Sequence, residues 1–197
     1  PVAADRLSSS LGEKFSTINV GGRALEEEQL IPIFSKSDTE KLWEPPFSRP
    51  LSGREFQAFG DIVSIRVDGE VLGTFAELGS AIQGALHAPV FAVNKGTVVF
   101  AGELPTLGKT VILDHGLGVS TLYAHLDLIL KNVGEKAQQG DTVGTVGTSG
   151  LAFGPMVEFQ IRIHGVPVRP AEWWDGNWVK GHIEGKISAV RKIIGLK

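Results

Sequence analysis

The chain has 197 residues, no cysteine and a formal net charge of −3. Its length suits one domain of ordinary size with attachments, and a hydrophobic content of 42% excludes an intrinsically disordered chain. The lack of cysteine excludes disulfides, thiol redox chemistry and cysteine metal ligands, and the charge balance gives no reason to expect nucleic acid as a partner. The 25 glycines, about 13% of the residues against a usual ~7%, predict many turns.

We interpret residues 1–46 as an N-terminal extension or linker with short helices. Segments 24–31 and 37–43 are predicted to be helical, the second with Ser37 or Asp38 as its N-cap. Because Pro1 is not a natural start, we expect a fragment or a mature form. The longest stretch without charged residues, 78–94, is interrupted by glycine, proline and polar residues, so no membrane-spanning helix is expected there.

Residues 47–175 alternate between short β-favouring runs and glycine turns. The runs are 63–67, 90–93, 97–101, 110–113, 119–125, 142–146 and 157–163. Turn signals such as Asp68-Gly69, Lys95-Gly96 and Gly140-Asp141 separate them. This pattern predicts a mainly β fold with added helices, in which the strands form an antiparallel sandwich or barrel-like sheet.

Residues 176–197 carry a different pattern. Ile183, Ile187, Val190 and Ile194 recur at intervals of four, three and four, which predicts an amphipathic helix over residues 182–194 that ends near Gly195. The apolar stripe of this helix either packs on the β domain, which we favour, or forms an interface with a partner.

Residue types alone reveal no catalytic machinery. No metalloprotease, nucleophile-elbow or phosphate-loop motif occurs. Strand alternation predicts that Thr121, Tyr123 and His125 share the less apolar face of their strand, where His125 could line a cleft or form an ordinary hydrogen bond. His164 and His182 are expected to be solvated.

Several short segments follow one another in order, with characteristic gaps between them. They are 47–60, 89–92, 96–101, 111–118, 121–126, 140–150 and 165–175. Together they cover about residues 43–180 and resemble the lysostaphin-type (LytM-type) zinc peptidases, which cut peptide cross-links in bacterial peptidoglycan. The resemblance implies an antiparallel LytM-type β-sheet domain over residues 47–175, followed by a C-terminal helix.

The metal-site motifs of that family are altered in this chain. Where the resemblance implies an H-x-G-x-D motif, Glu77 and Ala81 replace the histidine and the aspartate. Where it implies H-x-H, Met156 replaces the catalytic histidine and Glu158 the third zinc ligand. Only His125 keeps the identity that the family requires. A methyl group cannot coordinate a metal and a thioether cannot shuttle protons, so we predict no zinc, no cofactor and no catalytic residue in this vestigial cleft.

We therefore interpret the chain as a pseudoenzyme of the cell-shape-determining type, which scaffolds or regulates an active peptidoglycan hydrolase or homologous endopeptidase. The resemblance implies a homo- or heterodimer in the periplasm, anchored in the inner membrane through an upstream segment absent from this chain. Two alternatives stay open. One is a peptidoglycan-binding module whose cleft holds a stem peptide, and the other is a metallopeptidase with a site rebuilt from Glu77, Glu158 and His125.

Overall fold

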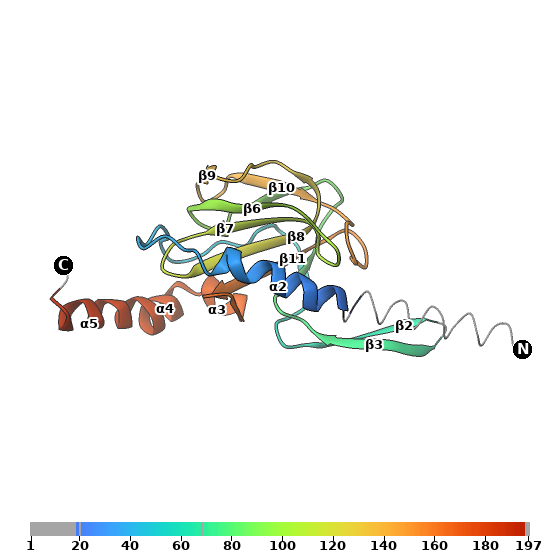
Figure 1. Ribbon diagram of the computed structural model, residues 1–197, viewed down its shortest axis with the longest axis horizontal. Coiled ribbons are helices and arrows are strands. Elements are labelled where there is room, and N and C mark those ends of the chain that lie inside the picture. Colours follow the sequence, from blue (N-terminus) through green and yellow to red (C-terminus); the bar gives the residue numbers. More distant parts are fainter. Residues whose placement is uncertain (1–18, 20, 68, 196–197) are drawn as a thin grey trace, which may run out of the picture.

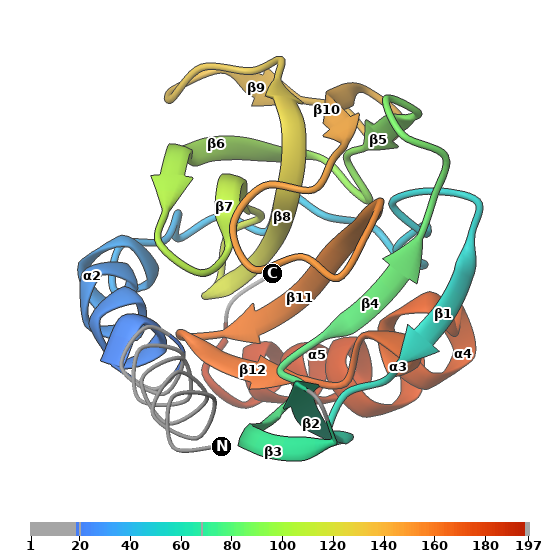
Figure 2. The same ribbon diagram turned by 90° about the vertical axis from the view of Figure 1, so that its right-hand side faces the viewer.

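The computed structural model describes residues 19, 21–67 and 69–195, and antiparallel strands form most of it (Figure 1). The strands are β1 Arg54–Gln57, β2 Ile62–Val67, β3 Glu70–Ala76, β4 Ser80–Gln83, β5 Pro89–Phe91, β6 Gly96–Leu104, β7 Gly108–Asp114, β8 Val119–Ile129, β9 Lys136–Ala137, β10 Thr142–Val146, β11 Met156–Ile163 and β12 Val166–Val168. Ten of them form one sheet along the path β1-β4-β11-β8-β7-β6-β9, with β12 beside β11, and β10 beside β5 and β8 (Figure 2). Strands β2 and β3 form a separate hairpin. The predicted mainly β, antiparallel fold is confirmed.

The main hydrophobic core lies against one face of the central strands. It includes Val111 and Leu113 of β7, Tyr123 of β8 and Phe159 of β11, all of them fully buried. Three aromatic rings close this core, with centroids 5.0–5.7 Å apart in tilted and edge-on contacts: Trp43, Phe47 and Trp173. The segment before the sheet and the segment after it therefore both pack on this face.

A helix covers the opposite face of the sheet. Helix α2, Gly22–Phe34, contains the predicted helical segment 24–31 and crosses the front of the strands in Figure 1. Leu30 and Phe34 of the helix join a second buried cluster with Ile112, Leu122 and Ala124. The sheet is thus covered on both sides.

The predicted helix over residues 37–43 is wrong. Ser37 and Asp38 bind the carboxylate of Asp114, through the Ser37 hydroxyl at 2.7 Å and the Asp38 backbone N–H at 2.8 Å. The backbone N–H of Leu42 donates to the His115 carbonyl at 2.9 Å. Tertiary partners therefore satisfy the groups that a helical turn would have used, and the segment crosses the end of the sheet without regular structure.

The C-terminal segment forms a run of short helices: α3 Pro170–Trp174, α4 Gly176–Val179, a π-helical turn η2 Lys180–Glu184 and α5 Gly185–Ile193. The Asp175 carboxylate caps α4 by accepting from the backbone N–H groups of Asn177 and Trp178. The predicted C-terminal helix is confirmed, and it projects past the sheet in Figure 1. Among the described residues, none of the helices has the length and apolar character needed to cross a membrane.

Candidate functional site

Strand β11 presents the vestigial positions on one face. Because side chains alternate along a strand, Val157 and Phe159 enter the main core, whereas Met156 and Glu158 face the opposite way. In the register of β4 and β11, Ala81 lies directly opposite Glu158. Two motifs that lie far apart in the sequence thus meet on the face of the sheet opposite the main core.

His125 reaches the same cluster by an irregular route. Its backbone has a φ of +62°, and its N–H donates to the Leu107 carbonyl at 2.8 Å. Tyr123 and Leu126 both belong to the main core, so the alternation of side chains breaks between them. The prediction that Thr121, Tyr123 and His125 share a face is therefore wrong, because His125 turns toward Glu158 instead.

Short polar contacts hold the His125 ring. Its Nδ1 lies 2.8 Å from the Ser149 carbonyl oxygen, which can only accept, so Nδ1 carries the proton. Its Nε2 lies 3.5 Å from Oε2 of Glu158. The chain reaches this position because Gly108 (φ +63°) packs against Ser149, where a Cβ would lie 2.4 Å from the Ser149 backbone.

Glu158 is engaged on both carboxylate oxygens. Oε1 accepts from the Gln160 side-chain amide, and Oε2 faces His125. Burial opposes its ionisation, but the hydrogen bond and charge of His125, with smaller contributions from Arg23 and Gln160, hold the pKa of Glu158 below its ordinary value. Glu158 is therefore the ionised member of the cluster.

Glu77 lies just before β4, and its pKa is shifted in the opposite direction to that of Glu158. Burial, together with the neighbouring charge of Glu158, raises its pKa to about 8. One carboxylate oxygen accepts from the Gly79 backbone N–H at 3.2 Å. At neutral pH Glu77 is thus mainly a neutral acid beside an ionised one.

Helix α2 binds the turn between β6 and β7, beside the buried cluster. Glu77, His125 and Glu158 are each only 3% exposed. The Glu26 carboxylate accepts from the backbone N–H and hydroxyl of Thr106 and from the backbone N–H of Leu107. A cavity of about 50 Å³ lies between α2 and the sheet, with Glu26 and Leu107 in its wall, and it has room for water, not for a peptide. A larger pocket of about 350 Å³ is lined by Met156 together with Phe56, Gln83 and Phe153.

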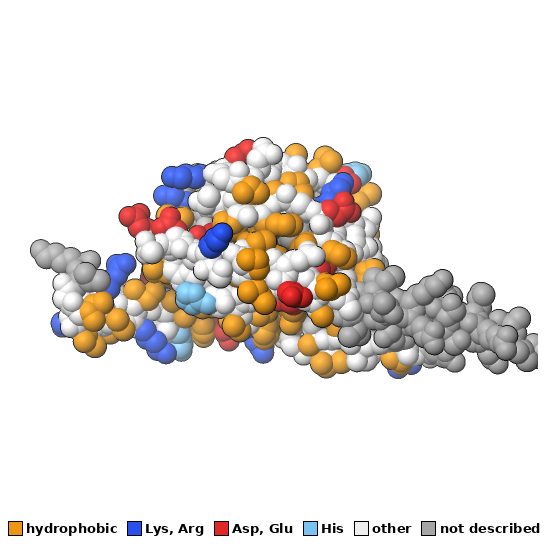
Figure 3. All heavy atoms as spheres, in the orientation of Figure 1, with side chains coloured by type: hydrophobic (Ala, Val, Ile, Leu, Met, Phe, Trp, Pro, Cys, Tyr) orange, Lys and Arg blue, Asp and Glu red, His pale blue; other side chains and the backbone are white. Residues whose placement is uncertain are grey.

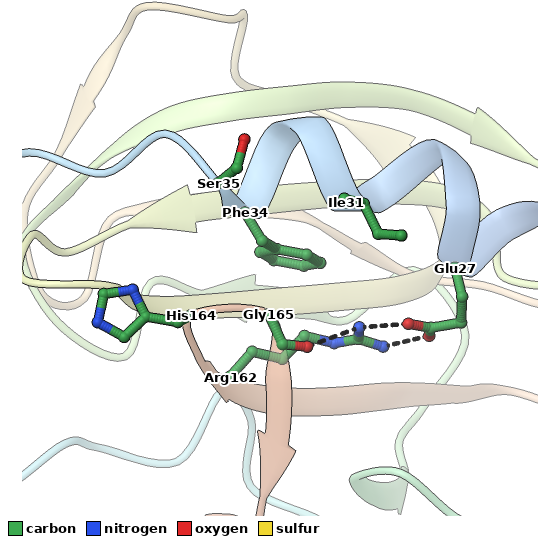
Figure 4. A pocket seen from close by; sticks show the side chains of 7 residues that line it. All are labelled: Glu27, Ile31, Phe34, Ser35, Arg162, His164 and Gly165. Carbon is green, nitrogen blue, oxygen red and sulfur yellow. Dashed lines mark hydrogen bonds and ion pairs between the residues drawn. The ribbon is translucent and has the colours of Figure 1, made fainter.

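An ion pair holds the adjacent residue of α2, Glu27. The guanidinium of Arg162 is 1% exposed and pairs with both carboxylate oxygens of Glu27, at 2.7 and 2.5 Å (Figure 4). Arg162 also donates to the Gly165 carbonyl and to Gln160, so polar contacts run along β11 from His125 to the helix. Sequence reasoning missed Gln160 and Arg162, although both share the alternation of Glu158.

The residues present do not fit a catalytic zinc. Ala81 offers no donor atom, and the oxygen atoms of Glu158 are bound to Gln160 and His125. Met156 has only a thioether, which is a poor ligand for zinc beside carboxylates and imidazoles. In the part of the chain that the structure describes, no three His, Cys, Asp or Glu side chains are grouped so as to hold a metal ion.

Comparison with known proteins gives one family. Residues 76–170 match peptidase family M23. The DD-carboxypeptidase/endopeptidase Mpg of Neisseria meningitidis is 38% identical over 82 residues, which is 42% of this chain and 19% of Mpg. The murein hydrolase activator EnvC of Escherichia coli is 28% identical over 124 residues, 63% of this chain and 28% of EnvC. The chain thus matches only 19% to 28% of these relatives' length.

Solved structures agree on the fold. A peptidase M23 structure from Pseudomonas aeruginosa superposes with a TM-score of 0.62 at 22% identity, over 80% of this chain and 62% of that one. The catalytic domain of lysostaphin from Staphylococcus simulans gives 0.55 at 20% identity, over 62% and 92%. Residues 76–170 match the family and these structures share its fold, so the resemblance is confirmed: the chain contains a peptidase M23 (LytM/lysostaphin-type) domain.

Proposed function

We propose that this chain is a catalytically inactive M23-fold protein that scaffolds or regulates an active peptidoglycan hydrolase in cell-wall remodelling and cell-shape control. The observation that carries the proposal is the buried cluster of Glu77, His125 and Glu158. Within it, the Glu158 carboxylate binds Gln160 and faces His125. Ala81 and Met156 complete the set of vestigial positions. Peptidase chemistry of this family's kind needs an open metal position and a path for the peptide, and this cluster supplies neither.

The relatives support a regulatory role. The same family includes a protein named as a carboxypeptidase/endopeptidase and one named as a murein hydrolase activator. This chain keeps the fold but has other residues where the resemblance implies zinc ligands, which fits the role of a hydrolase activator. The proposed partner is an active hydrolase or homologous endopeptidase, and the proposed place is the periplasm, with an inner-membrane anchor outside this sequence.

Burial also supports this role over the two alternatives. A peptidoglycan-binding module would need a stem peptide to reach the cleft, but His125 and Glu158 are each only 3% exposed, and the pocket of about 350 Å³ at Met156 is lined by neither of them. A rebuilt metal site would need Glu77 and Glu158 ionised together, whereas their mutual repulsion and burial favour a single charge.

Purified peptidoglycan and zinc analysis test the proposal together. We expect the chain to release no muropeptides and to hold no stoichiometric zinc, but to increase the rate at which a purified hydrolase from the same organism releases them. Stoichiometric zinc, or muropeptide release by the chain alone that His125→Ala abolishes, would show an enzyme. Lack of any effect on the hydrolases of the organism would remove the regulatory role.

A further inference from the structure

The apolar stripe of the C-terminal helices is only half covered. Ile183 and Ile187, in the first half, are partly buried against the main core. Val190 and Ile194 continue the stripe with the same spacing, but they are 54% and 60% exposed. Figure 3 shows hydrophobic side chains gathered at the projecting end of α5. We call Val190, Ile194 and the neighbouring Ile193 the overhanging stripe.

The flanks of this stripe are cationic. In a heptad, Ile187 and Ile194 take position a, Val190 takes d, and Lys186 and Arg191 take the flanking positions g and e. Lys192 falls at f, on the far side of the helix. Residues 176–197 contain five lysines and arginines and a single acid, so they carry +4 in a chain whose net charge is −3. Among the described residues, no ion pair includes Lys186 or Arg191.

We propose that the overhanging stripe docks an acidic amphipathic helix of another protein. Its aliphatic side chains would pack beside Val190 and Ile194, and its carboxylates would pair with Lys186 and Arg191. Opposite charges at e and g positions are what select partners in helix pairs. The proposal holds whether the partner is a hydrolase or a scaffold protein, so it does not depend on hydrolase regulation.

Geometry and charge argue against two other occupants. The overhanging stripe lies on the side of the helix that faces the domain, because Ile183 and Ile187 of the same stripe pack on the domain core. A flat lipid surface that reached Val190 and Ile194 would therefore meet the domain as well. Two copies of α5 packed together would bring Arg191 and Lys186 of each close to the same charges of the other, which is repulsive.

Designed peptides test the proposal on the full chain. Two peptides of three heptads, with leucine at a and d, carry either glutamate or lysine at e and g, and fluorescence anisotropy at low salt measures their binding. We expect the glutamate peptide to bind at least about tenfold more tightly than the lysine peptide. Combined Val190→Ser and Ile194→Ser should abolish binding, and combined Lys186→Glu and Arg191→Glu should reverse the preference.

Matched controls separate the surface from general effects. Lys192→Glu makes the same charge change on the far side of α5, and Ile62→Ser removes an exposed apolar side chain from β2. Both should leave binding unchanged. Equal affinity for the two peptides, or loss of binding in either control, overturns the proposal.

Two further measurements test the rejected occupants. Sedimentation should show no self-association that depends on Val190, and vesicles containing phosphatidylglycerol should not bind through Val190 and Ile194. Self-association that depends on Val190, or vesicle binding through Val190 and Ile194, would overturn the proposal. In cells, a photo-cross-linking residue at position 190 should attach to a carboxylate-rich amphipathic helix, and one at position 192 should not. A cross-linked segment without acidic residues would contradict the inferred chemistry.

Discussion

Glu77 and Glu158 share one buried cluster, yet their surroundings move their pKa values in opposite directions. His125 faces Glu158 at 3.5 Å and favours its charge, whereas Glu77 has burial and a like charge against it. A proton held by Glu77 thereby limits the charge buried in a cleft where the family's enzymes, as the resemblance implies, hold zinc. The cluster is electrostatically balanced without a metal.

The first prediction concerns Glu77 and pH. The folded-state pKa of about 8 lies above the ordinary 4.5, so the folded chain keeps a proton that the unfolded chain loses. The free energy of unfolding should therefore fall as pH rises toward about 9, by on the order of a few kcal/mol. Glu77→Gln, which is neutral throughout, should flatten this dependence. Denaturant unfolding of both proteins measures it.

The pH window for this test begins at 6.5. Burial lowers the pKa of His115 to about 4 from an ordinary 6.5, so His115 contributes a slope of the opposite sign below pH 6.5. Above pH 6.5, of these two groups only Glu77 still makes the free energy of unfolding depend on pH. Parallel curves for wild type and Glu77→Gln would contradict the assignment.

The second prediction restores the ligand set. Ala81 and Glu158 are register partners, so their Cβ atoms lie roughly 5 Å apart, close enough for side chains at both positions to share a metal. The triple variant Glu77→His, Ala81→Asp, Glu158→His should retain about one zinc per chain after dialysis. Wild type and the single variant Glu158→Gln should retain none. A folded triple variant without zinc would show that the three positions do not converge.

At the scale of elements, α2 packs on the face of the sheet where the cluster lies. Glu26 and Glu27 fix it to the sheet by polar contacts, while Leu30 and Phe34 bury their side chains beneath it. Apolar and polar contacts thus come from the same face of one helix. Removing either kind should loosen the cover over His125.

The third prediction tests this cover. Leu30→Ala should lower the free energy of unfolding by about 2–4 kcal/mol, because it leaves a cavity between α2 and the sheet. It should also increase the reactivity of His125 toward diethyl pyrocarbonate, mapped by mass spectrometry. Leu25→Ala, on the exposed side of the same helix, should change neither. A destabilised Leu30→Ala protein in which His125 stays protected would mean that the sheet alone buries the histidine.

The elements that sequence could predict are those that local pattern determines. All seven predicted β-favouring runs overlap strands, and the helix at 24–31 forms as part of α2. Short strands such as β4, with four residues, carry no such pattern and were not predicted. The failed helix at 37–43 was decided by a carboxylate 76 residues away, in the bond from Asp38 to Asp114.

The site shows the same limit more sharply. Motif gaps predicted the positions of Glu77, Ala81, Met156 and Glu158, and the structure places the last three on the paired strands β4 and β11, with Glu77 just before β4. The orientation of His125 depends on a positive φ held by contact with Leu107, which alternation could not foresee. The cover formed by α2 depends on Glu26 reaching Thr106, 80 residues along the chain. Such distant pairs leave no trace in local sequence.

For the whole molecule, the fourth prediction concerns metal removal. Because a bound metal would add its binding free energy to folding, a zinc protein loses thermal stability in a chelator. Here the melting temperature should change by less than about 1 °C when EDTA or zinc is added. Calorimetry with each additive measures this. A clear decrease in EDTA would reveal a metal that contributes to folding.

Helix α2 also bears on how such a protein could change over evolutionary time. Under the proposed inactive role, point mutations that returned zinc ligands to positions 77, 81 and 158 would place a metal in a cluster that stays buried beside α2. Changes that displaced α2 alone would expose the cluster without a metal. Under that role neither step by itself brings a catalytic benefit to select, so a return to peptidase activity would require both.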